Sequence, residues 1–144
     1  MFKTMIGRKF SSISRRAVCD IGSGSIKFQI ADVDLSTNKI VKNHIQKAQQ
    51  VLFINENKFT KSLQLEGLSK LKELQRLSEE CSATQSIGVA TQAFRNSQNG
   101  RECLSFFQEK LNFPLRIASP NEEARLGFEC AKAMTDIEEE ALHV

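Results

Sequence analysis

The stretch from Ala17 to Lys27 reads AVCDIGSGSIK, and its pattern decides the fold. The residues up to Asp20 favour a short apolar strand, which Gly22-Ser23-Gly24 interrupts. From Ile26 to Ile30 apolar and polar residues alternate, which is typical of a half-buried strand. The stretch therefore predicts two antiparallel strands joined by a tight turn.

The glycines of this turn do not match the two best-known phosphate-binding motifs. A dinucleotide-binding fold needs G-x-G-x-x-G before a helix, and a P-loop needs G-x-x-x-x-G-K-[ST]. Two interpretations stay open. In one, backbone N–H groups and Ser hydroxyls of residues 22–25 form an anion nest, and Asp20 holds magnesium, usually through water. In the other, the turn is only structural and uses glycine for positive φ.

Beyond the turn, strand and helix patterns alternate. The predicted strands after the first two lie within 39–53 (one or two), at 86–90 and at 113–117. The predicted helices are 63–81, 99–111 with Asn99 as its cap, and one after the Ser119-Pro120 start signal. The order β-β-β-α-β-α-β-α predicts an α/β fold with a mixed sheet of about five strands flanked by helices.

Two further polar residues occupy positions where a site could form. Arg95 follows the predicted strand that ends at Ala90, and an Arg fork at a strand end suits phosphate. Glu123 lies in the first turn of the last predicted helix, on its apolar side, where a carboxylate could activate water. Taken alone, each residue also has a simpler interpretation, as a solvated Arg and a favourable charge at a helix start.

Together these residues form three motifs that resemble the exopolyphosphatase/guanosine pentaphosphate phosphohydrolase (Ppx/GppA) family. The motifs are Asp20–Ser25, Ala90–Arg95 with Asn99, and Glu122–Leu126. The resemblance runs from about residue 16 to the end of the sequence. It implies the N-terminal lobe of an RNase H-like fold of the actin-like ATPase superfamily.

The resemblance also implies hydrolysis of a terminal phosphoanhydride, in inorganic polyphosphate or pppGpp. The implied phosphate-binding residues are Gly22, Ser23, Gly24, Ser25, Lys27 and Arg95. Asp20 would hold Mg²⁺, and Glu123 would be the general base. A non-catalytic phosphate-binding or interaction module is an alternative. So is another actin-like kinase or ATPase, although the Arg95 and Glu123 motifs argue against it.

The sequence departs from the family pattern at several places. Gly24 stands for the usual Asn, Lys27 for the usual Arg, and Ala48–Phe53 lacks an Arg-Leu-Gly-Glu-like segment. The family also closes its site with a second lobe that begins with a D-x-G-G-G-S loop, which this sequence does not contain. We therefore expect that a C-terminal lobe or a homodimer mate completes the site, and that the chain alone has little activity.

Charge is distributed unevenly along the chain. Residues 1–16 hold five of the 20 basic residues and none of the 17 acidic ones, so the remainder carries about −2. We predict a basic leader over 1–16 (a transit peptide or a disordered tail), the lobe over 17–134, and the start of a connection over 135–144. The expected location is cytoplasmic, or mitochondrial if the leader is a transit peptide.

Composition disfavours several other functions. Ten Phe without Trp or Tyr argues against a nucleic-acid surface, and no apolar run approaches the ~20 residues of a membrane span. The four cysteines are Cys19, Cys81, Cys103 and Cys130, and they form no C-x-x-C pair. Buried reduced thiols are therefore expected rather than a zinc site.

Overall fold

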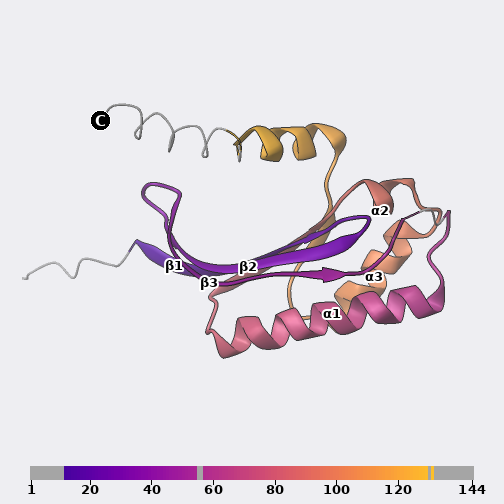
Figure 1. Cartoon of the computed structure of the whole chain (residues 1–144), viewed down its shortest axis with the longest axis horizontal. Coiled ribbons are helices and arrows are strands. Elements are labelled where there is room, and N and C mark those ends of the chain that lie inside the picture. Colours follow the sequence, from indigo (N-terminus) through magenta and orange to yellow (C-terminus); the bar gives the residue numbers. More distant parts are fainter. Residues whose placement is uncertain (1–11, 55–56, 130, 132–144) are drawn as a thin grey trace, which may run out of the picture.

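The computed structural model describes residues 12–54, 57–129 and 131, and it builds one sheet with helices on both sides (Figure 1). The elements are β1 (Ile13–Ile21), β2 (Ser25–Asp34), β3 (Lys39–Gln50), α1 (Lys61–Glu80), β4 (Gln85–Ala90), α2 (Gln92–Asn96), α3 (Gly100–Lys110) and β5 (Leu115–Ile117). Residues 120–129 form a further helix. The predicted mixed sheet of about five strands is confirmed, whereas the predicted element order lacks α2.

β1 lies at the centre of the sheet, whose strand order is β3-β2-β1-β4-β5. It pairs antiparallel with β2 and parallel with β4. Because β1 and β4 run in the same direction, their carboxyl ends meet at one edge of the sheet. The loop after β1 and the segment after β4 therefore start side by side, which makes this edge the natural place for a site.

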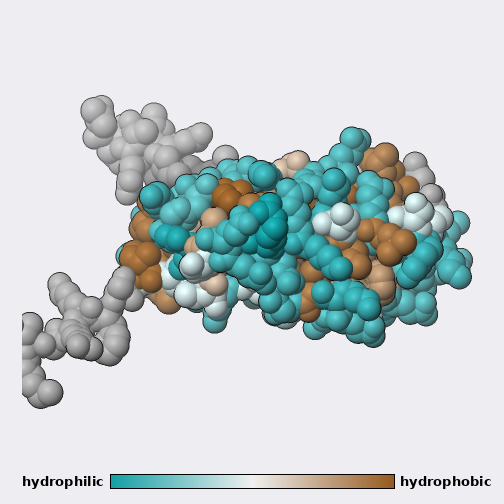
Figure 2. Space-filling view, turned by 90° about the horizontal axis from the view of Figure 1, so that it is seen from below, coloured by the Kyte–Doolittle hydropathy of each residue, from teal (hydrophilic) through white to brown (hydrophobic). Residues whose placement is uncertain are grey.

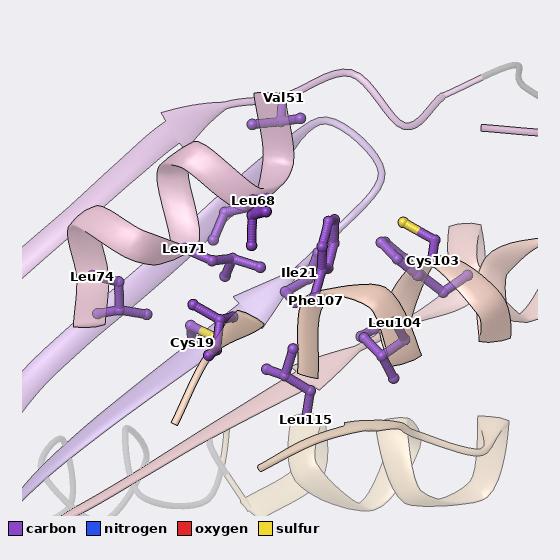
Figure 3. Close-up of a cluster of buried hydrophobic side chains, with 14 of the residues drawn as sticks. Cys19, Ile21, Val51, Leu68, Leu71, Leu74, Cys103, Leu104, Phe107 and Leu115 are labelled. Carbon is purple, nitrogen blue, oxygen red and sulfur yellow. The ribbon is translucent and has the colours of Figure 1, made fainter. Parts of the chain in front are cut away.

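The core lies between one face of the sheet and helices α1 to α3 (Figure 3). Cys19 and Ile21 of β1 point toward it, as the alternation of a strand requires. Leu68, Leu71 and Leu74 supply the buried stripe of α1, whereas Leu65 of the same helix is exposed. The opposite surface of α1 is mostly hydrophilic, as Figure 2 shows from below.

Asn99 and Gly100 form the junction between α2 and α3, where the chain is tightly packed. Asn99 was predicted to cap α3, but its side chain makes no cap bond. Instead, its buried amide accepts from the Phe59 N–H (2.8 Å) and donates to the Phe59 carbonyl (2.9 Å). A Cβ on Gly100 would lie 2.0 Å from the Phe94 carbonyl oxygen. Glycine is required here because backbone, not a side chain, occupies the space.

The first strand begins earlier than the sequence indicated. β1 starts at Ile13, so residues 13–16, which we assigned to the leader, belong to the sheet. A charged cluster explains this, because Arg15 Nε donates to Asp32 Oδ1 (2.8 Å) and Arg15 Nη1 to the Cys81 carbonyl (2.8 Å). His44 Nε2 lies 2.8 Å from Asp32 Oδ2. Arg15, a basic residue assigned to the leader, therefore belongs to a cluster that joins three strands.

Cysteine burial agrees with the expectation for most of the chain. Cys19 and Cys103 are buried free thiols, and burial raises the pKa of each to about 12. Cys81 is a half-buried free thiol, and Cys130 lies outside the described residues. In the described ranges, the helices include none that is long and apolar enough to cross a membrane.

We predict that Gly100→Ala lowers the unfolding free energy by about 1–3 kcal/mol, the usual effect of overpacking. The added methyl group would push α3 away from the Phe94 carbonyl. Urea unfolding measures the change. Gly127→Ala is the matched control, because a Cβ there meets nothing within 4 Å. It should leave stability unchanged or raise it slightly, since Ala favours a helix. Equal effects of the two changes would contradict the packing argument.

We predict that Asp32→Asn destabilises the fold at neutral pH and matters less in acid. Its bonds to Arg15 and then His44 lower the pKa of Asp32 from 3.8 to about 2. A lowered pKa means that this stabilisation is present above about pH 4 and is lost as the pH falls toward 2. Urea unfolding at several pH values tests this. The difference in unfolding free energy between wild type and Asp32→Asn should shrink in acid. Glu109→Gln, an exposed control, should show no such dependence on pH.

Candidate functional site

The turn between β1 and β2 does not use its glycines for positive φ. Gly22 and Gly24 both lie outside the left-handed region, and in the described ranges positive φ occurs at Asn38 and Ser82. The Gly22 N–H donates to the Ser25 carbonyl (2.9 Å), which closes the turn. A Cβ at Gly24 would meet nothing within 4 Å. Neither strain nor crowding therefore explains Gly24, and the purely structural interpretation is weakened.

Asp20 lies at the end of β1, on the face of the sheet opposite the core. It is paired across the sheet with Lys27 of β2 and Val89 of β4. Partial burial raises the pKa of the Asp20 carboxyl, the Lys27 cation lowers it, and the negative charge of Glu123 raises it again. Glu123 is more than one hundred positions away in sequence, so the fold has brought two candidate acids within electrostatic reach.

Arg95 and Glu123 form an ion pair. Arg95 does not follow β4 directly, as predicted, but lies in α2. Its Nη1 lies 2.8 Å from Glu123 Oε2 and donates to the Ala118 carbonyl (2.7 Å). The Arg95 side chain is 20% exposed and the Glu123 side chain 44%. The base and the phosphate ligand predicted from sequence are therefore each other's partners in this structure.

The helix over residues 120–129 starts as predicted. The Ser119 Oγ accepts from the Glu122 N–H (3.2 Å), which confirms the Ser cap. The Glu122 carboxylate pairs with Arg116 of β5, and this bond lowers the pKa of Glu122. Glu123 is largely exposed, and Leu126 and Phe128 leave their apolar surface exposed, so this helix is not packed closely against the rest of the lobe.

A hollow of about 630 Å³ adjoins the turn. Its lining comes from the turn (Ser23), the segment after β3 (Phe53, Ile54, Asn57) and the start of α2 with the residue after it (Gln92, Ala93, Asn96, Ser97). The residues that line it carry amides and apolar groups but no charge. The charged candidates Asp20, Lys27 and Glu123 are not among its lining residues, and neither is Arg95.

Sequence reasoning missed Arg116 and the role of the Ala118 carbonyl. Arg116 anchors Glu122, and Ala118 fixes the guanidinium that holds Glu123. The alternation of Leu115, Arg116 and Ile117 placed Arg116 on the outer face, but no local pattern indicates its partner. The described residues contain no group of three or more His, Cys, Asp or Glu that could hold a metal by itself.

Comparison with known proteins assigns the chain to a family. The sequence pattern that defines the Ppx/GppA phosphatase family matches residues 30–144. The chain therefore belongs to the Ppx/GppA phosphatase family, and the resemblance drawn from its three motifs is confirmed. No curated protein sequence matches it.

Solved structures show the same fold, and membership of the Ppx/GppA family identifies it as the actin-like ATPase fold. A Ppx/GppA family member from Aquifex aeolicus is 24% identical with a TM-score of 0.70, over 78% of this chain and 37% of that one. An exopolyphosphatase from Cytophaga hutchinsonii is 19% identical with a TM-score of 0.70, over 78% and 36%. An exopolyphosphatase-like protein is 20% identical with a TM-score of 0.71, over 78% of this chain and 35% of that one. This chain thus spans little more than a third of each of these structures.

We predict that Glu123→Gln lowers the pKa of Asp20, because it removes a neighbouring negative charge. Lys27→Met should raise the same pKa, because it removes the cation that opposes burial. A pH titration of the Asp20 carboxyl carbon by NMR measures both. Glu129→Gln, further along the same helix, is the control and should leave the titration unchanged. An unchanged pKa of Asp20 in Glu123→Gln would show that the two carboxyl groups do not interact.

Proposed function

We propose that this chain is the N-terminal part of a phosphoanhydride hydrolase that releases terminal phosphate from inorganic polyphosphate or pppGpp. One observation carries the proposal: Asp20, Lys27, Arg95 and Glu123 gather at the edge where β1 and β4 end. They stand beside a turn whose Gly24 leaves its backbone uncovered. Phosphoryl transfer needs mainly positioning and charge neutralisation, and this set offers both.

The turn and two cations would bind the phosphate. Ser23, Gly24 and Ser25 would supply backbone N–H groups and hydroxyls, and Lys27 a positive charge from the adjoining strand. Gly22 would shape the phosphate-binding turn, because its own N–H already donates to the Ser25 carbonyl. Because Gly24 has open space about it, a phosphate could approach the backbone closely. Arg95 would add its remaining guanidinium N–H groups, since Nη1 already contacts Ala118 and Glu123.

Glu123 would act as the general base for the attacking water. Its pairing with Arg95 suggests how the base becomes available, because a phosphate at the turn would compete for the same guanidinium. Glu123 would then be released while Ala118 keeps Arg95 in place. Substrate binding and activation of the base are thus coupled through one side chain.

Asp20 fits the role of a magnesium ligand. Burial and the negative charge of Glu123 both disfavour the ionised form of Asp20, and a cation beside Asp20 would offset both effects. Mg²⁺ commonly keeps several waters and takes one or two carboxylates together with substrate phosphates, so one Asp at this edge suffices. When bound, the ion would neutralise phosphate charge.

The rest of the site would come from a C-terminal lobe or from a homodimer mate, since the solved relatives are much longer than this chain. No nucleic acid or membrane enters the proposal. We place the protein in the cytoplasm, or in mitochondria if the basic start of the chain is a transit peptide. A non-catalytic phosphate-binding module is the second candidate, favoured by the Arg95–Glu123 pair that occupies the proposed base.

We predict that this chain binds tripolyphosphate more tightly with Mg²⁺ than without, and that Asp20→Asn removes the difference. Lys27→Met should weaken binding about tenfold, the effect of losing a charged hydrogen bond. Isothermal titration calorimetry measures both. Lys72→Met on the exposed side of α1 is the control and should bind like wild type. No binding by the wild-type chain would overturn the phosphate site.

Catalysis is tested in the natural polypeptide that contains this chain, with polyphosphate and pppGpp assayed in parallel. Glu123→Gln should lower phosphate release by about 100-fold or more, the usual contribution of a general base. Its binding of tripolyphosphate should be kept or improved, because Arg95 is freed. Undiminished release would disprove the role of Glu123, and wild-type binding without release would support the non-catalytic module.

A further inference from the structure

The edge of the sheet at the start of β4 is uncovered. β5 pairs with β4 only along Gly88–Ala90, although β4 begins at Gln85. The Gly88 N–H donates to the Pro114 carbonyl (2.9 Å), and the Ala90 carbonyl accepts from the Ala118 N–H (2.9 Å). Both residues thus direct their backbone groups toward β5. Since these directions alternate along a strand, Ser86 presents its own N–H and carbonyl to the same edge.

Pro114 ends the pairing at this edge. In the register of β4 and β5, the Ser86 carbonyl would need an N–H at position 114, and proline has none. The preceding residues 111–113 form bends instead of a strand. Within the described part of the chain, no backbone hydrogen bond joins Ser86 to this segment. Ser86 therefore lies on a free strand edge, the kind of edge that accepts another chain.

A hollow of about 660 Å³ runs along this free edge. Its lining includes Gln75 and Glu79 of α1, Asn112 and Phe113 before β5, Ser86, and Arg16 of β1. The volume is within the range of ligand pockets, about 300–1,000 Å³. It lies where β1 and β4 begin, whereas the Asp20 site lies where they end. The two sites are therefore separate.

Arg16 brings an unsatisfied donor to this hollow. Its Nε is shielded from solvent and has no hydrogen-bond partner. The Glu79 carboxylate, which also lines the hollow, accepts from Asn112 Nδ2 (3.0 Å). A buried donor without a partner is unfavourable, and an acceptor entering the hollow would remove the penalty. Because Nε is shielded, the half-buried side chain would have to turn its guanidinium into the hollow to reach such an acceptor.

We propose that this hollow binds an extended peptide segment that carries a carboxylate side chain. The peptide backbone pairs with Ser86 as an added strand, a common mode of peptide recognition. Its Asp or Glu side chain pairs with the Arg16 guanidinium in a charge-assisted hydrogen bond. The uncovered stretch Gln85–Ile87 matches about three peptide residues at ~3.3 Å per residue.

The test titrates the ¹⁵N-labelled chain with acetyl-Val-Glu-Val-amide and follows the amide of Ser86 and the Nε–H of Arg16 by NMR. Both signals should shift along one binding curve. Acetyl-Val-Gln-Val-amide should bind about tenfold more weakly, because it lacks the charge. Arg16→Gln should erase the preference for Glu over Gln. Arg101→Gln, an exposed arginine on α3, is the matched control and should keep it.

Several outcomes would overturn the proposal. Sodium acetate that shifts Arg16 as strongly as the peptide would show a simple anion site without strand pairing. A peptide that shifts the Arg16 Nε–H signal but not the Ser86 amide signal would also show anion binding without strand pairing. Equal affinities of the Glu and Gln peptides for the wild-type chain would exclude a role for Arg16, and this comparison needs no variant. The absence of any shift at millimolar peptide would exclude the site.

Discussion

The placement of β1 between an antiparallel and a parallel neighbour controls the rest of this structure. The pairing with β2 brings Lys27 opposite Asp20, and the pairing with β4 brings the start of α2 beside the turn. A slip of one residue in either register would turn Asp20 into the core and Cys19 outward. Burial of Cys19 and Ile21 therefore fixes the face on which Asp20 is displayed.

Charge, and not packing, joins the last described helix to the lobe. Arg116 pairs with Glu122, and Arg95 pairs with Glu123, while the apolar Leu126 and Phe128 remain exposed. Ion pairs at a surface contribute about 0–1 kcal/mol each, so this helix is held much more weakly than α1 or α3. A ligand that competes for Arg95 acts on the weakest junction of the fold.

Local sequence patterns predicted the fold well where a structural element depends only on residues close together in the chain. The Leu stripe of α1, the alternation around Phe28 and the Ser119 cap each depend on near neighbours, and the structure contains all three. The short helix α2 was missed, because its five residues carry too few apolar positions to show a period. Asn99 looked like a cap, but a partner 40 positions away, Phe59, uses its amide.

The site was less predictable because its geometry depends on long-range contacts. The sequence indicated Asp20, Arg95 and Glu123 as separate candidates, yet nothing in it shows that Arg95 and Glu123 pair with each other. Arg116 was missed for the same reason. The start of β1 was misplaced because charged residues were read as a tail, whereas Asp32, which also binds His44, supplies the partner that holds Arg15 in the sheet.

The cluster of phenylalanines beneath the turn has a consequence for folding. Phe53, Phe59 and Phe94 pack at interplanar angles of 59–61° with ring centroids 4.9–5.0 Å apart, and Phe94 also contacts Phe107. Phe53 also lines the neighbouring hollow, together with residues of the turn and of α2, so this hollow exists only once distant parts of the chain have assembled. Any molecule that occupies the hollow therefore binds only the folded lobe, and its concentration sets the melting temperature of the whole domain.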